Sequence, residues 1–396
     1  MILRTLYCKF TGREIIVDKA AILLAVLAFL IARPYFVWHT SIPDYALILM
    51  LFMLSMHSRL RKSLIGIVLI FAILYLWIAV RGPFTYIGAI LVFPTFLIFC
   101  TDESFLRKSF LFYKSFFSIT LIPSLAIFIT TIVSGLDLPY TQIEPFNAIK
   151  DGVYRQYPFL VVYERILGYP MLRFNGYYDE PGLIGTISAI LLISDNCNMK
   201  KWENWPILLS GIFSLSLFFF VLMGLYILIF SSLKYKVLIL VVASIAVSMA
   251  MSIDYLRESF FSRFIFENGR FSGDSRTDAS YDIWYNSFIS SKDVFLGLGG
   301  TVASEKNYGG ASYKDLIVTY GIIHFLLYIC SFLFFYLNMV GKNKRFLICS
   351  LMFLCVIYQR PSISDFYYIY LFVGAACAIK LSINYDTKSI CTSSYL

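Results

Sequence analysis

The chain has 396 residues, of which 59% are hydrophobic and only 14% are charged, with a formal net charge of +9. Soluble domains carry roughly a quarter charged residues, so this composition excludes an ordinary soluble protein and indicates an integral membrane protein. The apolar segments are long enough for helices and lack the ten-residue alternation of a β-barrel. They predict an all-α, polytopic membrane fold.

Hydropathy predicts about twelve membrane-spanning helices in a single transmembrane domain over residues 1–396. In chain order they lie near 16–38, 42–57, 63–80, 83–99, 110–133, 181–194, 205–218, 219–232, 236–252, 313–340, 346–359 and 366–381. The first follows a basic N-terminus without a small-residue cleavage site, which favours a span over a signal peptide. The continuous apolar run 205–232 could also form one long tilted helix.

The distribution of charge favours two helices in that run. The two termini, Lys114 and the short connections between spans then lie on one side of the membrane; the connections are 57–63, 100–109, 195–203, 233–236 and 341–345. Of the chain's 33 basic and 24 acidic residues, that side holds 19 and 7, which leaves 14 and 17 for the other. Basic residues concentrate on the cytoplasmic side of membrane proteins, so both termini are predicted to be cytoplasmic.

Two long segments fall on the opposite, external side, at 135–180 and 253–312. Neither contains a cysteine, which suits an oxidising exterior. The eight cysteines of the chain form no C-x-x-C pair and have no metal-ligand spacing with its three histidines. The sequence therefore predicts no metal site and no cofactor.

The first long segment ends in RFNGYYDEPGLIG, residues 173–185, directly before a predicted helix. Pro181 follows Glu180 where that helix would begin, a position that proline favours, and the amide groups at a helix start suit an anion. Two interpretations stay open. Asp179 and Glu180 cap the helix while nearby arginines only reach the interface, or the cluster binds an anionic ligand. The basic residues that approach the start of this helix are Lys150, Arg155, Arg165 and Arg173.

The second long segment predicts an amphipathic helix. Tyr281, Trp284, Tyr285 and Phe288 recur at the spacing of one helical face, and this face is expected to pack on the bundle or lie in the interface. The candidate anion-binding arginines near its start are Arg270 and Arg276, because guanidinium groups bind phosphate oxygens bidentately.

Two further features have ordinary structural explanations. The sequence Gly297-Leu-Gly299-Gly300 lacks the lysine of a phosphate-binding loop and predicts a turn. His324 lies among apolar residues in a predicted span, where an interhelical hydrogen bond is expected.

These motifs together resemble those of the O-antigen polymerase (Wzy) family. The resemblance rests on Arg-Phe-x-Gly followed by Glu-Pro at the start of a span, here 173–181. It rests also on Arg-Thr-Asp at 276–278, Trp284, Leu-Gly-x-Gly at 296–299 and Tyr-Gly-Ile at 320–322. At the level of sequence it covers about 165–190 and 270–325.

The resemblance implies a metal-independent glycosyltransferase with a C-type glycosyltransferase-like fold in the bacterial inner membrane. Such a polymerase transfers a growing chain from undecaprenyl pyrophosphate to the terminal sugar of another lipid-linked repeat unit, which produces O-antigen or capsular polysaccharide. The implied partners are the lipid-linked donor and acceptor, membrane lipid and a chain-length co-polymerase, and no nucleic acid.

The resemblance also suggests roles for the candidate residues. Arg173 and Arg276, with Arg165 and Arg270, would bind the donor pyrophosphate and stabilise the charge that develops on it. Glu180, with Asp179 next, would orient or deprotonate the attacking hydroxyl group. The aromatic candidates for sugar stacking, which an interfacial girdle would also explain, are Tyr177, Tyr178, Trp284 and Tyr285.

Two other functions stay open. A flippase or transporter of repeat units would be expected to have charged residues along its spans and short external loops, whereas this sequence has few charged residues in its spans and two long external segments. An O-antigen ligase of the related family would carry a histidine in the last long external loop, and 253–312 contains no histidine.

Overall fold

A computed structural model of the chain describes most of its helical segments. The described residues are 18–57, 65–81, 97–136, 138–145, 152–165, 173–252, 266–267, 270–271, 279–300, 313–340, 344–356 and 366–393. Within them the protein is mostly helical, as predicted.

Helices occupy the predicted spans wherever these are described; of 83–99 only 97–99 is described. The main helices are α2 (Lys19–Ile31), α3 (Ile42–His57), α4 (Ile65–Arg81), α6 (Glu103–Phe128), α7 (Pro181–Ser194), α8 (Asn204–Phe213), α9 (Leu217–Phe230), α10 (Leu233–Met251), α12 (Ala279–Ile289), α14 (Tyr313–Val340), α15 (Lys344–Leu354) and α17 (Phe366–Ser393). Short helical turns are η1 (Tyr35–Val37), η3 (Ile129–Val133) and η5 (Lys292–Val294).

Two helical segments of the described chain are long and apolar enough to cross a membrane, Glu103–Thr131 and Tyr313–Asn338. Several others are apolar but shorter. The run 205–232 is two helices, because α8 ends at Phe213 and α9 begins at Leu217. The 10 residues of α8 extend over about 15 Å, roughly half the thickness of a hydrocarbon core, so α8 is shorter than the span predicted for 205–218.

The surface of the bundle is apolar, whereas hydroxyl groups lie inside it. Large hydrophobic side chains are more than half exposed on several outer helices, including Phe52 of α3, Leu76 of α4, Leu228 of α9 and Leu240 of α10. Buried hydroxyl groups connect inner helices, as between Ser188 of α7 and Ser210 of α8, whose oxygen atoms are 3.0 Å apart. Outer surfaces of this kind suit lipid, and small polar residues are common where membrane helices pack.

Helix α7 lies at the centre of the bundle. All its side chains from 183 to 194 are buried against neighbours that include α8, α9 and α17. The start of α7 is therefore fixed by the packing of the whole core.

The first long segment contains a small sheet that the sequence analysis did not predict. Strands β1 (Thr141–Ile143), β2 (Gly152–Tyr157) and β3 (Leu160–Arg165) pair antiparallel in chain order, with Arg155 opposite Val162. Tyr154 and Val161 pack on Trp38 just after η1, which fixes the sheet to the bundle. The second segment contains a short hairpin of β4 (Phe266–Glu267) and β5 (Arg270–Phe271).

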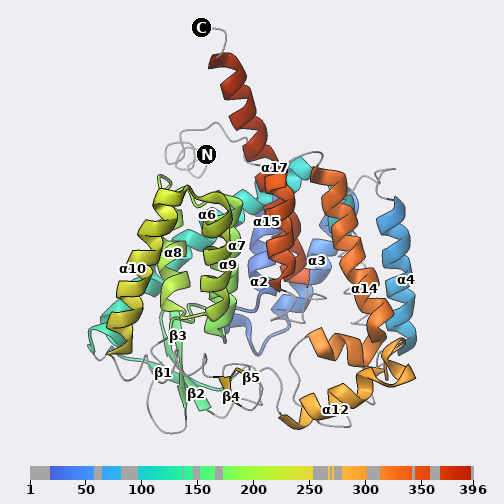
Figure 1. Cartoon of the computed structure of the whole chain (residues 1–396). Helices are drawn as coiled ribbons and strands as arrows, with labels where there is room; N and C mark the ends of the chain where they lie inside the picture. The colour runs from blue at the N-terminus through green and yellow to red at the C-terminus, as the bar shows by residue number, and fades with distance from the viewer. Residues whose placement is uncertain are drawn as a thin grey trace.

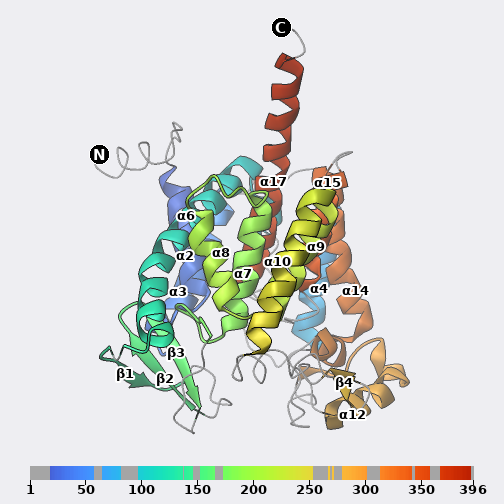
Figure 2. The same ribbon diagram turned by 60° about the vertical axis from the view of Figure 1, so that its left-hand side comes forward.

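The described parts of both long segments lie at one end of the bundle, with β1–β5 and α12 (Figures 1 and 2). We call this the loop end. Helix α2 begins and α17 ends at the opposite end, which we call the terminal end.

Candidate functional site at the loop end

The turn before α7 is held by backbone bonds from three other parts of the chain. The amide of Val161 in β3 donates to the carbonyl of Gly176 at 2.9 Å, and the amide of Tyr35 donates to that of Tyr177 at 2.7 Å. The amide of Phe174 donates to the carbonyl of Phe213, the last residue of α8, at 3.0 Å. Gly176 has φ +58°, and a Cβ atom there would lie 3.1 Å from Ile184. The glycine of the RFNG sequence is therefore required by the turn itself.

Arg173 supports the turn between α8 and α9. Its Nε donates to the carbonyl of Ser214 at 3.0 Å and its Nη2 to that of Leu215 at 3.3 Å. These carbonyls follow the end of α8, where partial negative charge gathers and a cation is favourable. Two of the five guanidinium donors are thus bonded to the backbone, which gives Arg173 a structural role that the sequence analysis did not predict.

The carboxylates lie at the predicted helix start. Pro181 is the first residue of α7 and Glu180 its N-cap, as expected. The Glu180 side chain makes no capping hydrogen bond, so a side-chain cap is not found at this residue, although its position at the N-cap suits the helix dipole. The carbonyl of Asp179 accepts from the Tyr154 hydroxyl and, at 3.4 Å, from the Asn175 amide. Burial, and then the charges of Asp179 and Glu180, raise the pKa of Tyr154, which keeps this donor protonated.

Tyr177 and Tyr178 point into the core, contrary to the expectation that they stack on a sugar. The ring of Tyr177 is 5% exposed and stacks on Tyr35, and its hydroxyl donates to the carbonyl of Thr120 at 2.8 Å. Tyr178 is fully buried beside Phe29. Because protein covers these rings, neither offers a face to a ligand in this structure.

Helix α12 packs on the first turns of α14, which confirms the predicted amphipathic helix. The Tyr281 hydroxyl donates to Oδ1 of Asp315 at 2.7 Å, and Nζ of Lys314 pairs with Oδ1 of Asp282 at 2.6 Å. The Lys314 ammonium also lies 5.3 Å from the ring centre of Tyr285. Burial, followed by the neighbouring Tyr313 and Asp315, raises the pKa of Tyr285 to about 12.

The two aromatic candidates of α12 differ in exposure. Tyr285 is buried in the contact with α14. Trp284 is half-buried, and its ring stacks on Phe288 with centroids 5.7 Å apart. Of the four aromatic candidates, Trp284 is the one whose described side chain keeps substantial exposure.

The glycine-rich sequence after η5 is a turn against α14, as predicted. The amide of Gly297 donates to Asp293 at 2.7 Å, that of Leu298 to Val318 at 2.7 Å and that of Gly299 to Thr319 at 3.0 Å. Because these three amides already donate to carbonyl oxygens, the amides do not form a phosphate-binding loop.

Helix α14 is kinked at Gly321, which has φ 86° and ψ 164°. Trp77 of α4 donates its indole N–H to the carbonyl of Tyr320 at 2.8 Å, beside the kink. His324 follows one turn later; it is 5% exposed, and its Nε2 has no hydrogen-bond partner. The interhelical hydrogen bond predicted for His324 is therefore not found at Nε2.

The remaining arginine candidates are only partly covered by the structure. Arg165 ends β3 opposite Gly152, and Arg270 begins β5 opposite Glu267, so both lie at the loop end. Arg276 lies outside the described residues. Whether these side chains converge with the start of α7 stays a prediction.

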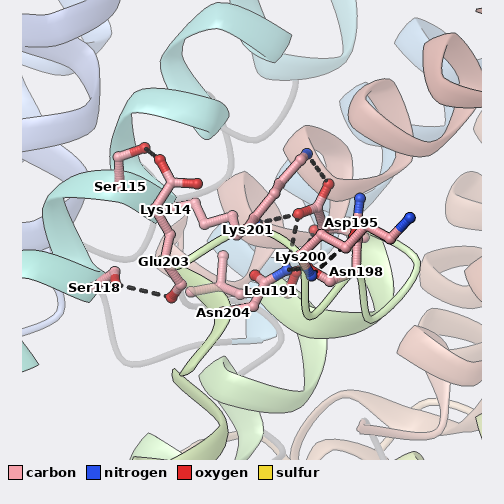
Figure 3. A network of polar contacts seen from close by, with 11 residues as sticks. Lys114, Ser115, Ser118, Leu191, Asp195, Asn198, Lys200, Lys201, Glu203 and Asn204 are labelled. Atoms are coloured by element: carbon pink, nitrogen blue, oxygen red, sulfur yellow. Dashed lines mark hydrogen bonds and ion pairs between the residues drawn. The ribbon is translucent and has the colours of Figure 1, made fainter. Parts of the chain in front are cut away.

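A buried ionic network at the terminal end was missed by the sequence analysis (Figure 3). Asp195, just after α7, pairs through Oδ2 with Nζ of Lys114 and through Oδ1 with Nζ of Lys201, both at 2.5 Å. The side-chain Nδ2 of Asn204 also donates to Oδ2, at 3.0 Å. Glu203 accepts from Ser115 at 2.8 Å. The one available signal was a lysine inside an apolar helix, where a charge needs a partner.

Charge balance explains why Asp195 remains ionised in this network. Burial alone would raise its pKa, but the ammonium groups of Lys114 and Lys201 outweigh that effect and hold the pKa below its ordinary value. The network joins α6, α7 and α8 on the side opposite the candidate site.

Among the residues that the structure describes, no group of three or more His, Cys, Asp and Glu side chains is placed to hold a metal ion. Comparison with known proteins found no matching family model, no matching curated protein and no matching solved structure. The family and the activity are accordingly argued from the residues of this chain.

Proposed function

We propose that the protein is a bacterial inner-membrane glycosyltransferase that polymerises undecaprenyl-pyrophosphate-linked repeat units into O-antigen or capsular polysaccharide. In this proposal the chain forms about twelve spans in a C-type glycosyltransferase-like arrangement, with both termini in the cytoplasm. The reaction occurs at the loop end, on the periplasmic face.

The apolar outer surface supports the membrane part of the proposal. Exposed side chains such as Phe52, Leu76 and Leu240 would each be costly in water and are accommodated by lipid. Arg173 bonds the carbonyls at the buried α8–α9 turn.

One observation carries the functional part: two polar segments far apart in the sequence lie at the same end of the bundle. The first contributes Asp179 and Glu180 at the start of the central helix α7, and the second contributes α12 with the half-exposed Trp284. The start of α2 and the end of α17 lie at the opposite end. This arrangement supports the sidedness inferred from charge.

The proposed chemistry divides the candidates by charge. Arg276, Arg270 and Arg165 bind the pyrophosphate of the donor and stabilise the charge it gains on leaving. Glu180 orients the attacking hydroxyl of the acceptor sugar and accepts its proton, with Asp179 beside it. Arg173 contributes by holding α8 and α9 against the turn that carries these carboxylates.

Deletion of the gene in its own host tests this proposal. The deletion strain is expected to lose the ladder of long polysaccharide on a gel while its surface lipid is still capped with a single repeat unit. Complementation with Glu180→Gln and with Arg276→Lys is expected to leave chains short, whereas Glu144→Gln, an exposed carboxylate after β1, restores the ladder. Loss of even the single unit in the deletion strain would contradict a polymerase.

The kink in α14 favours a second candidate, a flippase of lipid-linked repeat units. Interrupted helices mark substrate sites in many transporters, and Gly321 interrupts an apolar helix beside the buried, unpartnered Nε2 of His324. A flippase predicts that the deletion strain transfers no repeat unit at all. The same gel therefore separates the two functions.

A further inference from the structure

A second hydrophobic core joins α12 to the first turns of α14. Six buried side chains form it: Tyr281, Tyr285, Phe288, Val294, Ile317 and Val318. The partly buried Tyr313 and Phe325 pack against both this core and the main core of the bundle. The pair of Lys314 with Asp282 and the bond from the Tyr281 hydroxyl connect the same two helices. The buried core and these polar bonds join residues 279–300 to 313–320, and beyond Gly321 the core is contacted by the partly buried Ile322 and Phe325. We call residues 279–300 and 313–320 the α12 unit.

The α12 unit meets the long part of α14 at Gly321. Its φ of 86° with ψ of 164° belongs to a backbone region that essentially only glycine adopts. A Cβ atom at this position would lie 2.3 Å from the carbonyl oxygen of Phe295. The helical hydrogen-bond pattern is interrupted here, so Gly321 has the properties of a joint between two rigid parts.

Two hydrogen bonds that the structure shows at this joint come from Trp77 and Ile323. The Trp77 indole donates to the carbonyl of Tyr320, and the amide of Ile323 donates to Phe295 at 3.4 Å, which is long for such a bond. The unpartnered Nε2 of His324 lies one turn beyond the joint, with its ring 4.9 Å from that of Tyr320. Buried polar atoms without partners are rare, and this one favours a second arrangement in which it gains a partner.

We propose that the α12 unit is a lid that turns about Gly321 relative to the bundle, and that the structure shows one of its two positions. Trp77 of α4 latches this position by bonding the carbonyl of Tyr320. The lid regulates access to the loop end where α7 begins. That last point rests on the proposed function, whereas the hinge itself does not.

Distances between spin labels test the hinge in the purified full chain without any substrate. One label replaces the exposed Asn286 of α12 and the other the exposed Ser41 before α3. A reference pair joins Ser41 to the exposed Phe159 of the β2–β3 turn. Labels on noncanonical amino acids leave the eight native cysteines in place. The lid pair is expected to show two distance populations and the reference pair one.

The latch gives a matched pair of variants. Trp77→Phe removes one hydrogen bond across the joint, so the ratio of the two lid populations is expected to change about fivefold. Trp205→Phe removes an indole bond at the terminal end, to the carbonyl of Met199, and is expected to leave the ratio unchanged. A single narrow lid distance, identical in the wild type and in Trp77→Phe, would overturn the hinge.

Glycine substitutions locate the joint. Gly321→Ala is expected to shift the lid pair to the second distance, because the added Cβ does not fit the position seen here. Gly224→Ala in α9, where the added Cβ has open space, is the control and leaves the distances unchanged. An unchanged distribution in Gly321→Ala would show that the joint lies elsewhere.

The regulatory role is tested separately with undecaprenyl-pyrophosphate-linked repeat units from the host. Adding these repeat units is expected to change the ratio of the two distance populations of the lid pair. If the repeat units are polymerised but leave the populations unchanged, the hinge stands and its regulatory role is wrong. If the repeat units are not polymerised, the proposed function is wrong. The distance distribution of the lid pair without substrate still shows whether the hinge exists.

Discussion

Replacement of Asp195 by asparagine is expected to destabilise the protein more than removal of either lysine that pairs with it. The side chain of Lys114 is 3% exposed and that of Asp195 14%, whereas that of Lys201 is 38% exposed. Removing one partner of a buried pair costs about 3–5 kcal/mol, because the other charge is left buried without compensation. Asp195→Asn leaves the Lys114 ammonium in that state, and we expect a loss of about 3 kcal/mol.

The two lysines provide internal controls on the same carboxylate. Lys201→Met removes a partly exposed pair and is expected to cost about 0–1 kcal/mol. Lys114→Met is expected to lower the free energy of unfolding by an amount between those for Lys201→Met and Asp195→Asn, because Lys201 and Asn204 still bond Asp195. The free energy of unfolding is measured in detergent micelles by titration with sodium dodecyl sulfate. A loss below about 1 kcal/mol for Asp195→Asn would refute the reasoning that burial gives this pair its strength.

Three further predictions concern the same structure. Gly176→Ala is expected to lower the free energy of unfolding by about 1–2 kcal/mol, and the close contact of the added Cβ with Ile184 would lower it further. Gly135→Ala is the control and should cost less, because φ is also positive there but the added Cβ has open space. Arg173→Lys should cost about 1 kcal/mol and speed amide exchange at the α8–α9 turn, because an ammonium group cannot bond both carbonyls with the same geometry. Because the pKa of Asp195 is lowered in the folded protein, its carboxylate contributes stability above the ordinary pKa of an aspartate, and this contribution is lost as the pH falls through the lowered value. Asp195→Asn should remove this loss at low pH. Unfolding titrations at several pH values would detect the difference.

Features with a local chemical signature were predictable from the sequence. Pro181 marked the start of α7 because a proline lacks the N–H that a first helical residue leaves unused. The aromatic spacing from Tyr281 to Phe288 marked the buried face of α12. The charge distribution favoured two helices in 205–232, and the structure has α8 and α9 there. Hydropathy alone gives one continuous apolar run, whereas the charge distribution draws on the whole chain.

Features set by tertiary contacts were not predictable. Strands β2 and β3 are six residues each, and their turn carries Pro158 and Phe159 in place of the Asn-Gly pair that marks a tight hairpin. Gly321 lies in an apolar run whose hydropathy does not report a kink. Arg173 carried the charge expected of an anion site, yet its bonded partners are backbone carbonyls, which sequence patterns do not reveal.

The central claim is that the chain itself elongates lipid-linked glycan. The most direct measurement incubates the purified protein in lipid vesicles with undecaprenyl-pyrophosphate-linked repeat units from its host and resolves the products on a gel. The account predicts a ladder of lengthening chains in the presence of EDTA, lost in Glu180→Gln and kept in Glu144→Gln. Recovery of the repeat units unchanged, with properly folded protein, would contradict it.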